Sequence, residues 1–256
     1  MTIFAILYSM LIVANWKAYI EDFKRAKKLF ALSKRLVRAT GIRIVLAPPS
    51  PFLGALAANN KSRVAFSAQD ISVTTGGAQT GEATAAAYAA AGAAYAIIGH
   101  SERRALGETR EVIAQKLAHA FAHGLTPILC VGEHERDGGG RYLAFIREEL
   151  ASALTPLPSK ERAKIIVAYE PLWAIGKTAA DAIKPNDLVE MVLYIRKVLA
   201  ELLPGKGSQH IPVLYGGSVE PENARLLALD SGIDGFLVGH ASVDPDSLQL
   251  LAKHLA

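Results

Sequence analysis

The chain of 256 residues is long enough for one large domain or two modest ones. Hydrophobic residues make up 51% of it and charged residues 20%, a balance that excludes a disordered chain and predicts a sizeable buried core. The formal net charge is +4, without dense Lys/Arg clusters, which does not favour a binder of nucleic acid or of an anionic membrane. A small anionic substrate fits this charge better.

Cysteine usage and the N-terminal segment bear on the cellular compartment. Cys130 is the single cysteine, so no intramolecular disulfide can form, and no Cys/His cluster has the spacing of metal ligands. The apolar run over residues 3–14 has about 12 residues, whereas a membrane span needs roughly 20. We therefore expect a cytoplasmic protein without a metal or a membrane anchor. Because Met10 opens the run MLIVANWK, residues 1–9 are a candidate for an extra N-terminal leader.

Short β-branched runs alternate along the chain with longer segments of helical periodicity. The short runs predict eight strands, at residues 11–14, 43–47, 64–68, 95–98, 126–131, 165–169, 212–215 and 235–238. The helical segments between them are clearest at residues 21–39, 108–122, 142–154, 186–203 and 244–255.

The repeat of strand and helix predicts the fold class. Each unit averages about 32 residues, the size of one βαβ step, and the strands are continuously apolar, as parallel strands buried on both faces are. An open doubly wound sheet would also bury its strands in this way. Eight regular repeats without a Pro-, Gly- or Ser-rich linker favour a single α/β domain over residues 1–256, closed as a (β/α)8 barrel. Such barrels carry their chemistry on the loops that follow the strands.

Polar residues follow the first and fourth predicted strands. Asn15 and Lys17 come after the first, where a lysine considered alone is most simply a solvated charge. His100 follows the fourth, and Ser101 and Glu102 are suited to begin a helical turn there. The positive end of that turn would disfavour a protonated imidazole. A lone histidine is usually structural, but its place at the mouth of a barrel makes His100 a catalytic candidate.

Glu170 follows the sixth predicted strand and precedes an apolar loop, residues 171–176. A loop with Leu, Trp and Ile together is better explained as a lid that buries its apolar side on closing than as an ordinary connection. A loop packed permanently against the barrel is the alternative. Considered singly, a carboxylate such as Glu170 is most often the partner in a salt bridge.

Glycine-rich turns follow the last two predicted strands, in the segments Tyr215-Gly216-Gly217-Ser218 and Gly239-His240. In (β/α)8 barrels these two loops often bind phosphate through backbone N–H groups. A carboxylate would repel the anion in a site that only binds, so Glu170 on the same rim indicates proton abstraction. Without a metal or nucleotide motif, side chains must carry the chemistry, and proton transfer next to a carbonyl is within their range.

From Met10 onward the chain resembles the triosephosphate isomerase family. Four segments carry the resemblance, in the order of the family and at its strand ends: Asn15-Trp16-Lys17, residues 99–104, residues 168–176 and residues 215–219. The resemblance implies interconversion of dihydroxyacetone phosphate and D-glyceraldehyde 3-phosphate, a reaction of glycolysis and gluconeogenesis, without a cofactor. It also implies a homodimer formed through the loop around Thr80, which resembles the family's contact with the partner subunit.

The resemblance also implies roles for individual residues. Glu170 is the base that moves a proton between C1 and C2, His100 the neutral group that polarises the carbonyl, Lys17 the cation that offsets the enediolate charge, and Asn15 a polar group of the same pocket. The phosphate-binding positions are Gly176, Ser218, Gly239 and His240. The supporting positions are Ser101, Glu102, Cys130 and Tyr215.

Three segments depart from the family pattern. The tip of the lid reads Lys177-Thr178-Ala179-Ala180 after Gly176, His240 stands where the family has a second glycine, and Ala18-Tyr19 replaces Met-Asn next to the lysine. These departures leave two other functions open. One is the same chemistry on a longer ketose phosphate, such as a tetrulose phosphate, and the other is a non-catalytic barrel that binds a phosphorylated metabolite.

Overall fold

The computed structural model describes residues 9–176, 182–203, 211–229 and 231–256. Most of the candidate leader, residues 1–8, lies outside the described residues. The rewritten tip of the candidate lid, residues 177–180, lies outside them as well.

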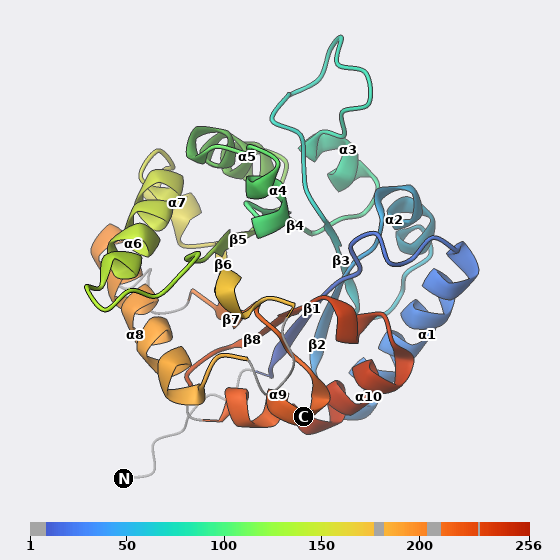
Figure 1. Ribbon diagram of the computed structural model, residues 1–256. Helices are drawn as coiled ribbons and strands as arrows, with labels where there is room; N and C mark the ends of the chain where they lie inside the picture. The colour runs from blue at the N-terminus through green and yellow to red at the C-terminus, as the bar shows by residue number, and fades with distance from the viewer. Residues whose placement is uncertain (1–8, 177–181, 204–210, 230) are drawn as a thin grey trace.

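Eight parallel strands close into a barrel, in which each strand pairs with its neighbours in chain order and β1 pairs with β8 (Figure 1). Their bounds are β1 Leu11–Asn15, β2 Arg43–Ala47, β3 Ala65–Ala68, β4 Tyr95–Ile98, β5 Thr126–Val131, β6 Ile166–Tyr169, β7 Val213–Tyr215 and β8 Gly235–Val238. Each bound lies within one residue of the sequence-based expectation. The predicted (β/α)8 barrel is confirmed.

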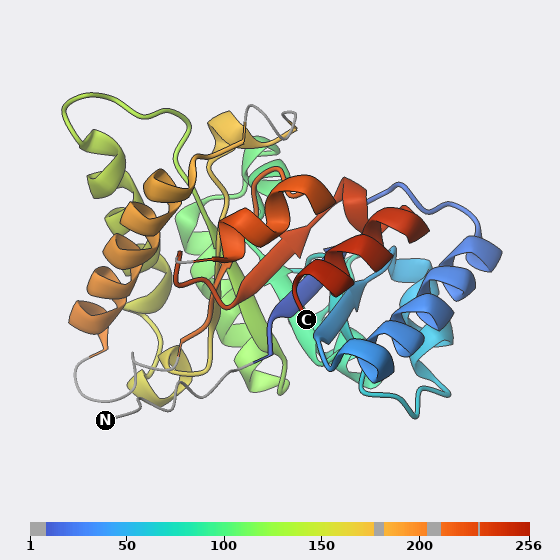
Figure 2. The same cartoon turned by 90° about the horizontal axis from the view of Figure 1, so that it is seen from below.

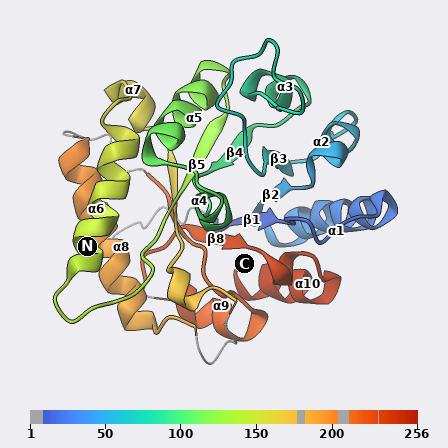
Figure 3. The ribbon, with the colours of Figure 1, turned by 45° about the horizontal axis from the view of Figure 1, so that its top comes forward.

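Helices surround the barrel (Figure 3). The α-helices are α1 Phe23–Thr40, α2 Ser50–Ala57, α3 Ala85–Ala90, α4 Ser101–Ala105, α5 Arg110–Ala122, α6 Arg141–Leu154, α7 Ser159–Arg162, α8 Pro185–Leu202, α9 Pro221–Ala228 and α10 Pro245–His254. Two 3-10 turns matter for the site, η1 Leu172–Ala174 and η4 His240–Ser242. Figures 1 and 2 show α1 beside α10, so the first and last helices close the outer ring. No described helix is long and apolar enough to cross a bilayer.

Polar side chains cap the starts of three of the long helices. Asp22 before α1, Thr109 before α5 and Asp244 before α10 each accept a backbone N–H of the first turn, groups that have no partner within the helix. Gly41 ends α1 with a left-handed φ of 75° that other residues rarely adopt. All five long helices begin and end within two residues of the predicted bounds.

The apolar side chains form two cores. The larger one lies between strands and helices and includes Phe66, Leu117 and Ile195. The second contains alternate residues of the strands, which fill the barrel: Leu11, Val13, Val45, Ala47, Ile97, Ile128, Cys130, Ile166, Ala168, Leu214 and Leu237. Because parallel strands bury both faces here, their sequences are continuously apolar. The filled interior leaves the ends of the strands as the place for polar side chains.

Candidate active site

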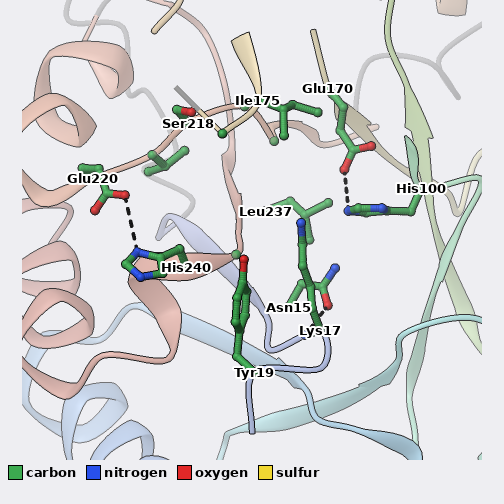
Figure 4. Close-up of a pocket in the computed structure, with 15 residues that line it drawn as sticks. Asn15, Lys17, Tyr19, His100, Glu170, Ile175, Ser218, Glu220, Leu237 and His240 are labelled. Atoms are coloured by element: carbon green, nitrogen blue, oxygen red, sulfur yellow. Dashed lines mark hydrogen bonds and ion pairs between the residues drawn. The ribbon is translucent and has the colours of Figure 1, made fainter. Parts of the chain in front are cut away.

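A cavity of about 320 Å³ lies among the loops that follow β1, β4, β6, β7 and β8 (Figure 4). All eight residues expected to act on or bind the substrate line it: Asn15, Lys17, His100, Glu170, Gly176, Ser218, Gly239 and His240. Residues as far apart in the sequence as Asn15 and His240 thus meet in one place.

The imidazole of His100 and the carboxylate of Glu170 are in contact. The Nε2 atom of His100 lies 3.2 Å from Oε1 of Glu170, and both side chains are buried. The second oxygen of Glu170 accepts the backbone N–H of Ser101 at 3.1 Å. The sequence predicted that a histidine after β4 and a glutamate after β6 would share one cavity, and the structure places them there.

A hydrogen bond defines which ring nitrogen of His100 is an acceptor. The sequence predicts a helical turn at Ser101 and Glu102; the turn is α4, and His100 itself caps it, since its Nδ1 accepts the backbone N–H of Glu102 at 3.2 Å. A nitrogen that accepts a hydrogen bond carries no proton. Nε2, the atom that faces Glu170, is therefore the ring nitrogen left to act as a donor.

Two glycines make room for Glu170. A Cβ atom on Gly216 would lie 2.9 Å from Cγ of Glu170, and a Cβ on Gly132 would lie 1.7 Å from its carbonyl oxygen. Both distances are shorter than van der Waals contact allows. Glycine at these positions, one after β5 and one after β7, is thus a steric requirement of the place that Glu170 occupies.

The backbone of Lys17 is strained and held in place. Its φ of 45° is left-handed, which costs a non-glycine residue roughly 1–3 kcal/mol. Asn15 Oδ1 accepts the N–H of Lys17 at 3.1 Å, and Gln69 Nε2 donates to its carbonyl oxygen at 2.9 Å. Gln69 also donates to the carbonyl oxygen of Ala47 at 2.9 Å. Gln69 was not predicted from the sequence, because its role depends on this contact across 52 residues.

The ammonium group of Lys17 lines the cavity and pairs with Glu102. Its Nζ lies 2.7 Å from Oε1 of Glu102. Partial burial acts to raise the pKa of Glu102, but the hydrogen bond and the charge of Lys17 outweigh it, so this pKa is lowered. Glu102 therefore stays ionised and orients Lys17 from outside the cavity.

Glu133, a buried carboxylate after β5, is a second residue that sequence reasoning missed. Its Oε1 accepts the hydroxyl of Tyr169 at 2.7 Å and Nε1 of Trp173 at 2.9 Å. Arg136 Nε lies 3.4 Å from the same oxygen. Burial and the charge of Glu133 raise the pKa of Tyr169. An acid directly after a predicted strand was the signal available. Through its hydrogen bond with Trp173, Glu133 anchors the candidate lid to the loop after β5.

The remaining predicted residues lie around the cavity. Ser218 is buried, and its N–H donates to the carbonyl oxygen of Ala174 at 3.3 Å, which ties the loop after β7 to η1. The ring of Tyr215 packs edge-on against Phe236, with centroids 6.5 Å apart. Cys130 belongs to the core inside the barrel, where burial raises the pKa of its thiol well above the ordinary value. Tyr215 and Cys130 thus belong to the packed core beneath the site.

A second histidine and glutamate lie on the opposite side of the same cavity (Figure 4). Nδ1 of His240 is 4.0 Å from Oε1 of Glu220, and the ring of Tyr19 meets the imidazole edge-on, with centroids 6.1 Å apart. Tyr19 and Glu220 line the cavity together with His240. Glu220 was not predicted from the sequence.

The described residues include no group of three His, Cys, Asp or Glu side chains that could hold a metal ion. A buried glutamate, a histidine and a lysine around one small cavity at the mouth of a (β/α)8 barrel are the arrangement expected of an enzyme, with side chains suited to proton transfer.

Comparison with known proteins identifies the family. Residues 10–255 match the family model described as triosephosphate isomerase. A triosephosphate isomerase of Symbiobacterium thermophilum is 38% identical over 249 residues, 96% of each chain. That of Carboxydothermus hydrogenoformans is 38% identical over 248 residues, 94% of this chain and 97% of that protein. That of Alkalilimnicola ehrlichii is 39% identical over 248 residues, 92% and 94% of the two chains. The chain belongs to the triosephosphate isomerase family, as its motifs predicted.

These matches also bear on the two other functions that the sequence left open. The names of these relatives are those of catalysts acting on triose phosphates. Neither a longer ketose phosphate as the substrate nor a barrel that only binds is favoured by them.

Proposed function

We propose that the protein interconverts dihydroxyacetone phosphate and D-glyceraldehyde 3-phosphate, with Glu170 as the base and without a cofactor. The observation that carries this proposal is the 3.2 Å contact between Nε2 of His100 and Oε1 of Glu170 in a cavity that Lys17 also lines. Membership of the triosephosphate isomerase family supports the same reaction.

The proposed reaction begins at C1 of dihydroxyacetone phosphate. The carboxylate of Glu170 takes a proton from C1, the electron pair of that C–H bond forms the C1–C2 double bond, and the carbonyl oxygen at C2 takes up the negative charge. In the resulting enediolate the proton of the C1 hydroxyl passes to the oxygen at C2, which becomes a hydroxyl, and the C1 oxygen becomes the aldehyde oxygen as the double bond opens. Glu170 returns its proton to C2. No electron acceptor is needed, because oxidation at C1 balances reduction at C2.

His100 donates to the oxygen on which charge develops. Its neutral tautomer carries the proton on Nε2, so this atom can donate to a carbonyl oxygen and shuttle a proton between the two substrate oxygens. Lys17 places a positive charge on the same cavity and stabilises the enediolate, with Asn15 as a further polar group. Glu102 positions Lys17, and the backbone N–H of Ser101 positions Glu170.

The phosphate group of the substrate lies, in this proposal, between the loops after β7 and β8. Gly176, Ser218, Gly239 and His240 surround that end of the cavity, where glycines allow close approach to backbone N–H groups. Residues 171–176 act as a lid that closes over it. Closure keeps water out and prevents the enediolate from eliminating its phosphate.

We further propose a homodimer in the cytoplasm. The loop around Thr80, between β3 and α3, projects from the barrel, and its residues from Gly76 to Gly81 are exposed (Figure 1). A second cavity of about 470 Å³, lined by Asp70, Glu82 and Arg103, opens beside it and could receive the same loop of a second copy. A sugar phosphate substrate and a chain with one buried cysteine suit the cytoplasm.

The purified chain tests the proposal in a coupled isomerase assay with dihydroxyacetone phosphate. We expect turnover, and exchange of the C1 proton with deuterium from the solvent. The Glu170→Gln variant should lose about three or more powers of ten in kcat with a smaller change in KM, because the base acts in the transition state. Glu21→Gln, an exposed glutamate ahead of α1, is the matched control. Near-normal turnover of Glu170→Gln, or binding without exchange, would refute the proposal.

A further inference from the structure

The cavity contains two histidine–glutamate pairs, and the proposed reaction uses one of them. His100 and Glu170 face each other on one side, and His240 and Glu220 lie on the other, with Lys17 between the two pairs (Figure 4). His240 and Glu220 come from the loops after β8 and β7, the loops to which the phosphate group is assigned. The second pair therefore concerns the phosphate end of the substrate.

A carboxylate at an anion site needs an electrostatic explanation. Glu220 lines the cavity, and an ionised Glu220 repels a phosphate dianion. Burial raises the pKa of Glu220, whereas the charge of His240 opposes that shift. A protonated His240 beside Glu220 would cancel the repulsion and leave a positive charge facing the substrate. The pair of His240 and Glu220 can therefore attract the phosphate group only when His240 is charged.

The imidazole of His240 is available to a ligand. Its side chain is 75% exposed, and the edge-on ring of Tyr19 limits its orientations. Such an exposed pair with Glu220 is weak in water, at about 1 kcal/mol or less. A dianion that displaces water from the cavity strengthens every charge interaction within it. The imidazolium would then be held between two negative groups.

Other charged groups also act on His240. Asp244, at the start of α10, has its pKa lowered by hydrogen bonds from Ser247 and by the charge of His240. From the loop after β1, Lys17 approaches Gly239, since a Cβ there would lie 3.4 Å from its Cε. Arg25 of α1 donates to the carbonyl oxygen of Val243 at 3.0 Å. Glu220 and Asp244 therefore act in favour of a charged imidazole, and Lys17, which approaches the neighbouring Gly239, acts against it.

We propose that the side chain of His240, and not its backbone alone, binds the dianion as an imidazolium, with Glu220 as its counter-ion and Tyr19 as its positioning partner. This inference rests on the proposed assignment of the phosphate group to the loops after β7 and β8. Its consequence is that binding of the dianion takes up a proton at His240. Affinity for a dianion should then fall as the pH rises through the titration of a histidine.

Sulfate is the appropriate probe, because it remains a dianion over the whole pH range in which histidine titrates, whereas phosphate does not. Its dissociation constant is measured by calorimetry at about pH 5.5, 7.0 and 8.5. Sulfate is then displaced with dihydroxyacetone phosphate to show that the two share a site. The variants are His240→Gln, which cannot be charged, and His240→Lys, which is charged throughout. His123→Gln, an exposed histidine after α5, is the control.

The expected result is a difference in pH dependence between the variants. The wild-type protein should lose about fivefold more affinity for sulfate between about pH 5.5 and pH 8.5 than His240→Gln loses. His240→Lys should keep the tight binding at the higher pH, and His123→Gln should follow the wild type. Equal affinity of wild type and His240→Gln at every pH would overturn the inference. So would a loss in His240→Gln that does not depend on pH.

The experiment separates failure of this inference from failure of the proposed function. Calorimetry needs no turnover, so sulfate binding is measured even on an inactive chain. If dihydroxyacetone phosphate does not displace sulfate, the assignment of the phosphate site is wrong, and the inference falls with it. If displacement occurs and His240→Gln behaves as the wild type, the role of His240 alone is wrong.

Discussion

Nε1 of Trp173 donates a hydrogen bond of 2.9 Å to Oε1 of Glu133, so a buried carboxylate after β5 holds the segment that follows β6. Trp173 belongs to η1, the apolar turn directly after the proposed base Glu170. The place of that turn is therefore determined by a residue in a different loop.

A double-mutant cycle measures this contact. Trp173→Phe keeps most of the ring and removes the donor, and Glu133→Gln removes the charge of the acceptor. Because hydrogen bonds to charged groups are the stronger ones, we expect a coupling of about 1 kcal/mol in the free energy of unfolding, determined by urea denaturation. The control pairs Glu133→Gln with Trp16→Phe, since Nε1 of Trp16 has no described partner. The control should be additive; equal coupling in both cycles would contradict the prediction.

Gly216→Ala should impair catalysis by crowding Glu170. The new methyl group would lie 2.9 Å from Cγ of Glu170, and overpacking of this kind costs about 1–3 kcal/mol. We expect kcat/KM to fall about tenfold or more in steady-state assays. Gly138→Ala is the matched control, because a Cβ there meets nothing within 4 Å. Unchanged kcat/KM in Gly216→Ala would show that catalysis does not depend on the position of the Glu170 side chain next to Gly216.

Gln69→Met should act through Lys17. The substitution keeps the length of the side chain but removes the donor that holds the carbonyl oxygen of Lys17 at 2.9 Å. Relief of the strained backbone displaces the ammonium, so we expect kcat/KM to fall about tenfold. In a Lys17→Met background the same substitution should have almost no further effect on kcat. An equal loss in both backgrounds would mean that Gln69 acts elsewhere.

Cys130 should resist alkylation in the native protein. Burial raises the pKa of this thiol, so the nucleophilic thiolate forms only at a higher pH than usual. An exposed cysteine reacts faster as the pH rises toward about 8.5, whereas Cys130 should stay unlabelled by iodoacetamide until urea unfolds the chain. A Leu193→Cys variant supplies the exposed comparison, since that position on α8 is 62% exposed. Rapid labelling of native Cys130 would contradict its burial.

The strands and long helices were predictable because local chemistry determines them. A continuous apolar run such as Thr126–Val131 is buried on both faces in a closed parallel barrel, and Asp22, Thr109 and Asp244 mark the starts of helices by their capping chemistry. Short helices such as α3 and α9 were not assigned, because six or eight residues give too little periodicity.

The meeting of His100 and Glu170 was predictable from topology, since the loops after parallel strands share one rim of the barrel. The residues that were missed act over long sequence separations. Gln69 reaches Lys17 across 52 residues and Trp173 reaches Glu133 across 40, and no local pattern marks either contact. The roles proposed for the phosphate-binding residues stay predictions until a ligand is measured.

Closure of the barrel has a consequence for synthesis of the chain. The seam that joins Leu11–Asn15 to Gly235–Val238 connects the first strand to the last. During translation, β1 can pair with β2 early, but its other edge waits for a strand made near the end of synthesis. Until then, the unpaired N–H and C=O groups along Leu11–Asn15 can form hydrogen bonds with a strand of another chain. The nascent protein is therefore most prone to aggregate before residues 235–256, which begin with β8, emerge.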